Sequence, residues 1–274
     1  MARKIELKGR TAVVTGAAGG IGRAIAVSLA RRGCHLALAD INDAGLAETL
    51  ALIAKPGLRV THHHLDVADR DAVAAFPEIV QATHHGADLL INNAGVALGG
   101  TFEQVSEEDF EWLFEINFWG VVRMTRGFLP VLKASDDACI VNLSSIYGII
   151  APPGQTAYSA SKFAVRGFSN ALRYELQGTT IGVTVVHPGG VATSIAKSAR
   201  IGAAVSAEEE ARGREEHDRL LRLPPETAGE TIVRGIERRR ARVLVGSDAR
   251  FISLIERAVP ASYGPILDWL RRRL

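Results

Sequence analysis

Two side chains that could exchange a proton lie one helical turn apart in the segment TAYSASK, residues 156–162. Tyr158 and Lys162 are four positions apart, with only small residues between them, and positions i and i+4 lie on one face of an α-helix. A phenol has a pKa of about 10, which is too high for a base at neutral pH, and a nearby cation lowers it. The pair is therefore either an acid–base group or an ordinary surface pair.

A second group of residues could hold a phosphate. The segment TGAAGGIG, residues 15–22, stands between a β-branched run and a helical pattern. Glycines allow a tight strand-to-helix turn, and free N–H groups at a helix start attract a pyrophosphate. Asp40 ends the next strand-like run, 20 residues after Gly20, which is the spacing expected for a carboxylate that binds an adenosine ribose. A plain turn with a helix-capping aspartate is the alternative.

Asp40 also bears on the choice of dinucleotide. Its carboxylate can accept hydrogen bonds from both ribose hydroxyls of NAD, and it would repel the 2′-phosphate of NADP by roughly 1–4 kcal/mol, depending on the local dielectric. No arginine or lysine stands at position 40 or at Ile41, nor directly before Gly19 or Gly20. We therefore expect NAD as the cofactor and regard NADP as less favoured.

The chain around these residues alternates between strand-like and helix-like segments. Continuous apolar strands that alternate with helices are typical of a parallel sheet covered on both faces. We predict an α/β fold, a Rossmann-type doubly wound parallel sheet of about seven strands with helices on both faces. The predicted strands are residues 11–16, 35–40, 58–67, 87–95, 138–145, 181–188 and 242–246.

The helices and the C-terminal third are less regular. Pro77 weakens the predicted helix over 69–83. A long helix is predicted from about Glu107 to Lys133, because Ser106 and Asp109 form a capping pattern. Residues 194–225 are polar and helix-prone and are interpreted as a substrate lid, followed by a C-terminal tail over 248–274. Since the chain shows no repeat and no low-complexity linker, we expect one domain over 1–274.

Composition excludes several classes of protein. The chain has 274 residues, a net charge of +2, 47% hydrophobic and 23% charged residues, which is an ordinary soluble composition and argues against nucleic acid as the main partner. Cys34 and Cys139 stand in or beside apolar runs and are expected to be buried free thiols of a cytoplasmic protein. No signal peptide or membrane span is expected. Residues 62–64 are all histidine, but alternation along a strand would separate them, so no metal site is predicted.

Seven motifs, in order, resemble those of the short-chain dehydrogenase/reductase family. The resemblance covers about residues 7–195. Ser145 precedes Tyr158 by 13 residues, which matches the family better than Ser144 does. The motifs are TGAAGGIG, DV at 66–67, NNAG at 92–95, INFWG around Asn117, NLSS at 142–145, YSASK at 158–162 and HPGGVATS at 187–194.

The resemblance implies a role for each matching residue. Tyr158 would be the general acid and base, Ser145 would bind the substrate oxygen, and Lys162 would bind the nicotinamide ribose. Asn117 would complete the catalytic group by holding a water that links Lys162 to solvent. The implied cofactor contacts are Gly16, Gly20, Ile21, Gly22, Asp40, Asp66, Val67, Asn93, Ala94, Gly95, Tyr158, Lys162, Pro188, Gly189, Val191 and Thr193.

The implied activity is hydride transfer between NAD(H) and a secondary alcohol or ketone. Apolar loop residues suggest that this small-molecule substrate is hydrophobic. One alternative is a non-catalytic dinucleotide-binding regulatory or scaffold protein, and the complete catalytic group argues against it. Another is an epimerase, and the short C-terminal part argues against that. The loop residues are Val96, Leu98, Ile146, Tyr147, Ile149 and Ile201.

Two surfaces suggest further partners. The helices predicted at 107–133 and from 156 onward carry more aromatic and aliphatic side chains than one stripe facing a sheet needs. Together with the family resemblance, this predicts a homotetramer or a homodimer. The tail combines Trp269 with three terminal arginines; packing against protein is the default expectation, and contact with an anionic membrane is an alternative.

Overall fold

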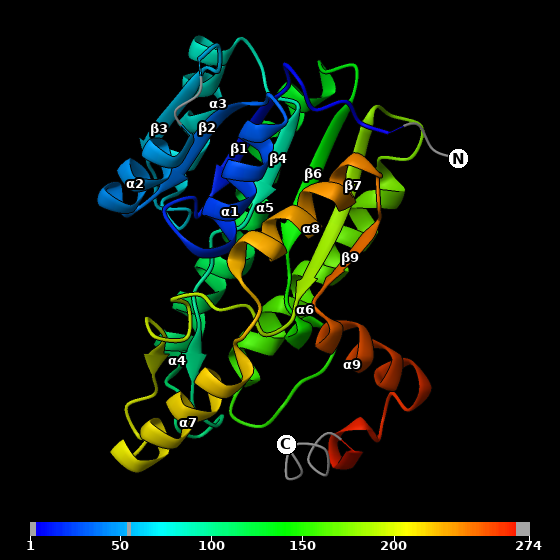
Figure 1. The fold of residues 1–274 in the computed structure, drawn as a ribbon. Helices are drawn as coiled ribbons and strands as arrows, with labels where there is room; N and C mark the ends of the chain where they lie inside the picture. Colours follow the sequence, from blue (N-terminus) through cyan, green and yellow to red (C-terminus); the bar gives the residue numbers. More distant parts are fainter. Residues whose placement is uncertain (1–3, 54–55, 267–274) are drawn as a thin grey trace.

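β-Branched and aliphatic runs form the strands of a seven-stranded sheet in the computed structural model, which describes residues 4–53 and 56–266, apart from the side chains of 216–218. All strand pairs are parallel, and the order is β3-β2-β1-β4-β6-β7-β9 (Figure 1). This confirms the predicted fold class. The strands are β1 Thr11–Thr15, β2 His35–Asp40, β3 Val60–His64, β4 Leu89–Asn92, β6 Ala138–Leu143, β7 Ile181–Pro188 and β9 Arg242–Val245.

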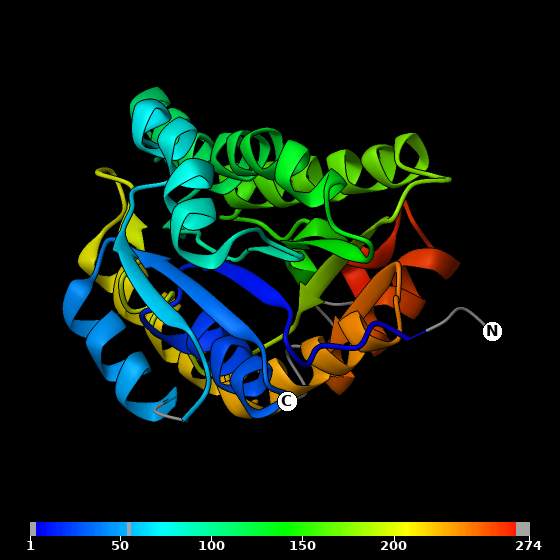
Figure 2. The same cartoon turned by 90° about the horizontal axis from the view of Figure 1, so that it is seen from above.

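Helices cover both faces of the sheet, as Figure 2 shows. Successive strand residues point to opposite faces, so Val14 belongs to the core under α1, α2 and α8, whereas Val13 belongs to the core under α3, α5 and α6. The helices are α1 Gly20–Arg31, α2 Asp43–Ile53, α3 Arg70–His84, α4 Glu107–Phe114, α5 Gly120–Lys133, α6 Thr156–Glu175, α7 Ala207–Leu220, α8 Pro225–Glu237 and α9 Ser247–Ala258.

The strand order reverses beside β1. The chain runs outward from β1 to β2 and β3 and then crosses to β4 on the other side of β1. The turns after β1 and β4 therefore diverge at the carboxyl edge of the sheet, which is where open α/β sheets bind ligands. This reversal places the glycine-rich turn beside Asn93, Ala94 and Gly95, which follow β4.

One predicted helix differs in detail from the structure. The helix expected over 107–133 is interrupted by a π-helical turn, Glu115–Trp119, between α4 and α5. A π turn inserts one residue without changing the apolar pattern enough to be recognised in a sequence. The predicted start of the long helix is confirmed, because Ser106 Oγ accepts a hydrogen bond from Asp109 N at 3.1 Å. Helix α3, in contrast, continues through Pro77, as the predicted helix over 69–83 does.

The segment 194–225, which we expected to be a lid, contains more structure than its composition suggests. Its short strand β8, Arg200–Ile201, pairs in parallel with β5, Leu98–Gly99, and α7 follows. Further on, α9 begins the predicted tail, but Trp269 and the terminal arginines lie outside the described residues. Cys34 and Cys139 are free and buried, as expected. None of the helices in the described ranges is both long enough and apolar enough to cross a bilayer.

Candidate active site

The glycine-rich turn after β1 is tight and leaves the start of α1 open. Gly16 and Gly20 have φ values of +66° and +52°, which side chains disfavour. A Cβ on Gly22 would overlap the carbonyl oxygen of Gly16, whereas a Cβ on Gly19 would meet nothing within 4 Å. The N-cap residue of α1 is Gly19, and no acid lies in its first turn. The N–H groups there are therefore available to an anion, and this cradle fits a pyrophosphate.

Asn93 fixes the shape of this turn from the neighbouring strand. Its Nδ2 donates to the carbonyl oxygens of Thr15 and Gly16, each at 3.0 Å. Its backbone N–H donates to Thr15 Oγ1, also at 3.0 Å. The predicted cofactor residue thus acts here by holding the glycine turn. Thr15, which sequence reasoning missed, accepts two of these three bonds at the end of β1.

The carboxylate of Asp40 lies beside the turn, as the 20-residue spacing predicts. Its two oxygens accept hydrogen bonds from Ala18 N at 2.9 Å and Asn42 N at 3.0 Å. Arg23 also reaches this region, but its guanidinium pairs with Glu48 at 2.7 Å and donates to Thr49 at 3.0 Å. The acid therefore lies beside the glycine turn, where the sequence analysis expects a ribose contact, and the nearby arginine is already paired with an acid.

The residues predicted to flank the adenine follow β3. Asp66 Oδ1 accepts a hydrogen bond from Ala68 N at 2.9 Å, which closes a short turn. Val67 is buried, and a Cβ on Gly120 would lie only 2.9 Å from its side chain. These contacts hold the turn after β3 against α5 at the same edge of the sheet as Asp40.

Helix α6 presents Tyr158 and Lys162 on one face. The Nζ atom of Lys162 lies 5.6 Å from the centre of the Tyr158 ring and donates to the carbonyl oxygen of Leu143 at 3.2 Å. Lys162 is only 4% exposed. Ser145, which follows β6, makes a side-chain hydrogen bond with Tyr158. The structure therefore brings together the three predicted groups from two distant segments.

Burial shifts both titratable groups away from their ordinary values. It raises the pKa of Tyr158 to about 12, although the hydrogen bond from Ser145 opposes the shift, and Tyr147 adds to it. It also lowers the pKa of Lys162 to about 8. The rise in the pKa of Tyr158 is opposite to the lowering that the sequence argument required. The physical reason is that desolvation of the phenolate outweighs the favourable contacts within the chain.

Asn117 lies inside the π-helical turn and is fully buried. Its Oδ1 accepts a hydrogen bond from Val96 N at 2.8 Å, and its Nδ2 donates to Val96 O at 3.0 Å and to Ser161 Oγ at 3.3 Å. A Cβ on Gly95 would lie 3.0 Å from Asn117 Oδ1 and 3.3 Å from Lys162 Nζ. The amide thus joins the segment after β4 to α6, and the water that we predicted it holds stays a prediction.

The turn after β7 also borders the candidate site. Pro188 ends the strand, and Val191 is buried. Thr193 reaches the glycine turn, because a Cβ on Gly20 would lie 3.0 Å from its methyl carbon. The predicted cofactor residues therefore line one edge of the sheet, although they are spread over 178 positions, from Gly16 to Thr193.

His187 belongs to the site and was not predicted. It is fully buried, and its Nδ1 lies 2.8 Å from the carbonyl oxygen of Ser145. Burial lowers its pKa to about 4, so the ring is neutral at pH 7 and Nδ1 carries the proton that it donates. A histidine at the end of an apolar strand carries no sequence signal for this contact, which supports the turn that holds the Ser145 side chain.

Five of the six predicted substrate-side residues divide into two groups, and the sixth, Ile201, pairs with Gly99 between β8 and β5. Val96 and Leu98 pack in a cluster with Tyr158, and the ring of Tyr147 meets that of Tyr158 edge-on at 6.1 Å. Ile149, in contrast, is 1% exposed and packs in a separate cluster with Ile146 and α9, so it supports the site from behind. Among the described residues, no three metal-ligating side chains gather, and His63 and His64 contact different neighbours, Phe76 and Asp43.

Comparison with known proteins identifies relatives of this chain. A family model described as short chain dehydrogenase matches residues 10–203. The Mycobacterium tuberculosis protein named "Putative oxidoreductase SadH" is 43% identical over 261 residues, which cover 94% of both proteins.

Two solved structures share the fold. A short chain dehydrogenase/reductase from Burkholderia phymatum in complex with NAD is 30% identical, with a TM-score of 0.85 over 93% of this chain and 95% of the other. An alcohol dehydrogenase from the archaeon Thermococcus sibiricus, complexed with 5-hydroxy-NADP, is 28% identical, with a TM-score of 0.72 over 86% of this chain and 94% of the other.

Proposed function

Since the chain belongs to the short-chain dehydrogenase family and is an oxidoreductase, we propose that it transfers a hydride between NAD(H) and a hydrophobic secondary alcohol or ketone. The observation that carries this proposal is the convergence of Ser145, Tyr158 and Lys162 beside the glycine turn, with Lys162 Nζ 5.6 Å from the Tyr158 ring centre. A phenol with a hydroxyl and a buried ammonium near it supplies the groups that carbonyl reduction needs.

In this mechanism Tyr158 exchanges the proton. A pKa of about 12 keeps its hydroxyl protonated at neutral pH, so it can donate a proton to a ketone oxygen. The Ser145 hydroxyl stabilises the negative charge that develops on the same oxygen. When bound, NADH supplies the hydride, and NAD accepts it and brings a positive ring charge.

Alcohol oxidation needs Tyr158 in its deprotonated state. Lys162 contributes to that state, because a pKa of about 8 leaves its ammonium mostly charged at pH 7. Its bond to Leu143 O fixes the position of the charge.

Asp40 is the basis for proposing NAD over NADP. Its oxygens already face the glycine turn and retain lone pairs for ribose hydroxyls. Arg23 cannot pair freely with a 2′-phosphate, because Glu48 and Thr49 hold its guanidinium. Structural relatives bind either kind of dinucleotide, so the preference rests on these residues of this chain.

The substrate side supports a neutral, apolar substrate. Val96, Leu98 and Tyr147 pack around Tyr158. The cation of β8, Arg200, is engaged elsewhere: it stacks 3.7 Å above the Trp112 ring and pairs with Asp109 at 3.1 Å. We propose that the segment 194–225, attached to the body through β5 and β8, is the substrate lid.

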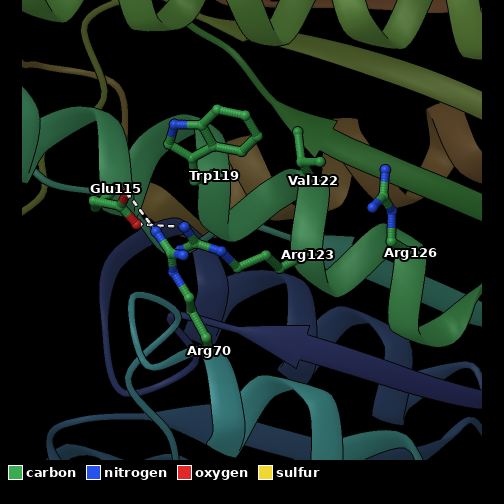
Figure 3. Close-up of a pocket in the computed structure, with 6 residues that line it drawn as sticks. All are labelled: Arg70, Glu115, Trp119, Val122, Arg123 and Arg126. Atoms are coloured by element: carbon green, nitrogen blue, oxygen red, sulfur yellow. Dashed lines mark ion pairs between the residues drawn. The ribbon is translucent and has the colours of Figure 1, made fainter.

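We further propose a cytoplasmic, single-domain enzyme that assembles as a homotetramer or homodimer. Trp119, at the end of the π-helical turn before α5, is 45% exposed, and Phe163 and Tyr174 on α6 are 38% and 69% exposed. Figure 3 shows the adjoining pocket of about 330 Å³, where Glu115 pairs with Arg123 at 2.5 Å and with Arg70 at 3.6 Å. Aromatic side chains beside a charged pocket are typical of a protein interface.

The proposed activity can be tested directly. Purified protein is mixed with NAD and a panel of secondary alcohols, and with NADH and the matching ketones, while the absorbance of reduced cofactor is followed. We expect turnover with apolar substrates. Binding of NAD without turnover across the panel would favour the non-catalytic alternative.

A further inference from the structure

The turn at Gly189 and Gly190 is held by two segments that come much later in the chain. The backbone N–H of Gly190 donates to Asp248 Oδ2 at 2.7 Å. The carbonyl oxygen of Gly190 accepts hydrogen bonds from Arg222 N at 3.0 Å and Leu223 N at 2.9 Å. Gly190 is therefore hydrogen-bonded through its N–H to the first turn of α9 and through its carbonyl oxygen to the end of the proposed lid.

Two glycines make room for the Asp248 carboxylate. A Cβ on Gly189 would overlap its oxygens, and a Cβ on Gly246 would do the same. Gly246 also has a φ of +99°, a conformation that other residues rarely adopt. The carboxylate thus fills a space that only glycines at both positions leave open, which indicates a specific contact between α9 and the turn.

The segment that Asp248 holds continues into the candidate cofactor site within a few residues. Val191 N donates to Gly189 O at 2.9 Å, and Ala192 N donates to Leu223 O at 2.9 Å, so the turn is continuously hydrogen-bonded. Thr193 then lies against Gly20 in the glycine turn. A shift of Gly190 would therefore move Thr193 relative to the start of α1.

The residue after Asp248 supports the other half of the site. Ala249 is fully buried and packs with Ile146 and Ile149, in and after the 3₁₀ turn Ile146–Gly148 that follows Ser145. The first turn of α9 thus contacts the Ser145 segment through Ala249 and the Gly190 segment through Asp248. Both segments lie next to the space that the reacting end of a dinucleotide would occupy.

We propose that Asp248 is a positioning residue that holds the 188–193 turn in the orientation that receives the nicotinamide end of the cofactor. This inference rests on the proposed function as an NAD-dependent enzyme. Asp248 itself touches neither substrate nor cofactor. It acts through the N–H of Gly190, and it couples the C-terminal helix to the cofactor site.

The test compares full-length wild type with Asp248→Ala, Asp248→Asn and, as a control on the same helix, Glu256→Ala. NAD affinity is measured by calorimetry, and amide exchange of the peptide that covers 188–193 is measured with and without NAD. A hydrogen bond to a charged acceptor is worth about 1.5–3 kcal/mol, and because this bond is exposed we expect the low end, an increase of roughly 10-fold in the Kd of Asp248→Ala.

We expect Asp248→Asn, whose amide oxygen can still accept the bond, to be weakened less, and Glu256→Ala to bind as wild type does. NAD should protect the 188–193 peptide in wild type and much less in Asp248→Ala. Equal Kd and equal protection in wild type and Asp248→Ala would overturn the inference and leave the proposed function intact. A wild type that binds neither NAD nor NADP would overturn both.

Thermal unfolding identifies a variant that does not fold. If Asp248→Ala is such a variant, Asp248→Asn decides: a weaker NAD affinity with faster exchange at 188–193 supports the role, and wild-type values for both refute it.

Discussion

The Nζ atom of Lys162 lies 5.6 Å from the centre of the Tyr158 ring, one turn along the same helix. Lys162 is buried and Tyr158 is half-buried, and desolvation moves their pKa values in opposite directions, to about 12 for Tyr158 and to about 8 for Lys162. Each shift disfavours the charged form of its group. The chain alone therefore stabilises the neutral phenol, which is the form that donates a proton.

Replacing Tyr158 by Phe should remove proton transfer and keep the fold, because only one oxygen is lost. We expect turnover to fall by at least ~100-fold, the usual contribution of general acid–base catalysis, with NAD affinity nearly unchanged. Steady-state kinetics and calorimetry measure the two quantities. Tyr174→Phe, on the exposed side of the same helix, is the matched control. Near-normal turnover of Tyr158→Phe would refute the proposed role.

Replacing Asp40 by Ala should relax the preference for NAD. The variant loses the acceptor for the ribose hydroxyls and the repulsion toward a 2′-phosphate, so kcat/KM should fall for NAD and rise for NADP. Asp43→Ala is a suitable control, because Asp43 begins α2 three residues further on and pairs with His64 instead. If the unmutated enzyme already prefers NADP, the argument from Asp40 is wrong.

Two buried histidines should make the protein sensitive to acid. Burial is the main cause that lowers the pKa of His84 and of His187 to about 4, and for His84 the neighbouring Arg59, His35, His63 and His85 contribute to this shift. An unfolded histidine titrates near 6.5, so the unfolded chain binds more protons between about pH 6.5 and 4. The free energy of unfolding should therefore fall as pH falls through this window, by on the order of 3 kcal/mol for each histidine.

His84→Gln tests this expectation, because glutamine can still bond to Thr61 Oγ1, which lies 2.9 Å from His84 Nε2. Urea unfolding at pH 7.5 and pH 5 should show a smaller loss of stability in the variant than in wild type. His62→Gln, at an exposed position on β3, should lose as much as wild type. The same loss in His84→Gln as in wild type would contradict the assignment.

Replacing Trp119 by Glu should disrupt assembly. The substitution places a charge at the end of the π-helical turn before α5, beside Glu115 in the pocket of Figure 3. Light scattering at micromolar concentration should show a dimer or tetramer for wild type and a smaller species for the variant. Leu52→Glu, at a 63% exposed position on α2, is the control. A wild type that is a stable 29.3 kDa monomer would refute the proposed interface.

Local features of the sequence were enough to predict the architecture and to single out candidate site residues that the structure gathers at one edge of the sheet. Alternating apolar strands and helices imply a covered parallel sheet, because each pattern depends on neighbouring residues alone. The four-residue spacing of Tyr158 and Lys162 places them on one helix face by geometry, and the interval from Gly20 to Asp40 follows from one strand–helix–strand unit.

Only the tertiary structure decided how these residues are held and charged. The pKa of Tyr158 rises because packing removes water from the phenol, and no spacing in the sequence reports that loss of solvent. Local sequence patterns likewise do not predict three other features of the structure. These are the π-helical turn that buries Asn117, the pairing of β5 with β8, and the hydrogen bond between Gly190 and Asp248, which are 58 positions apart. Each depends on contacts between segments distant in sequence, whereas a helix or strand pattern depends on residues within a few positions of one another.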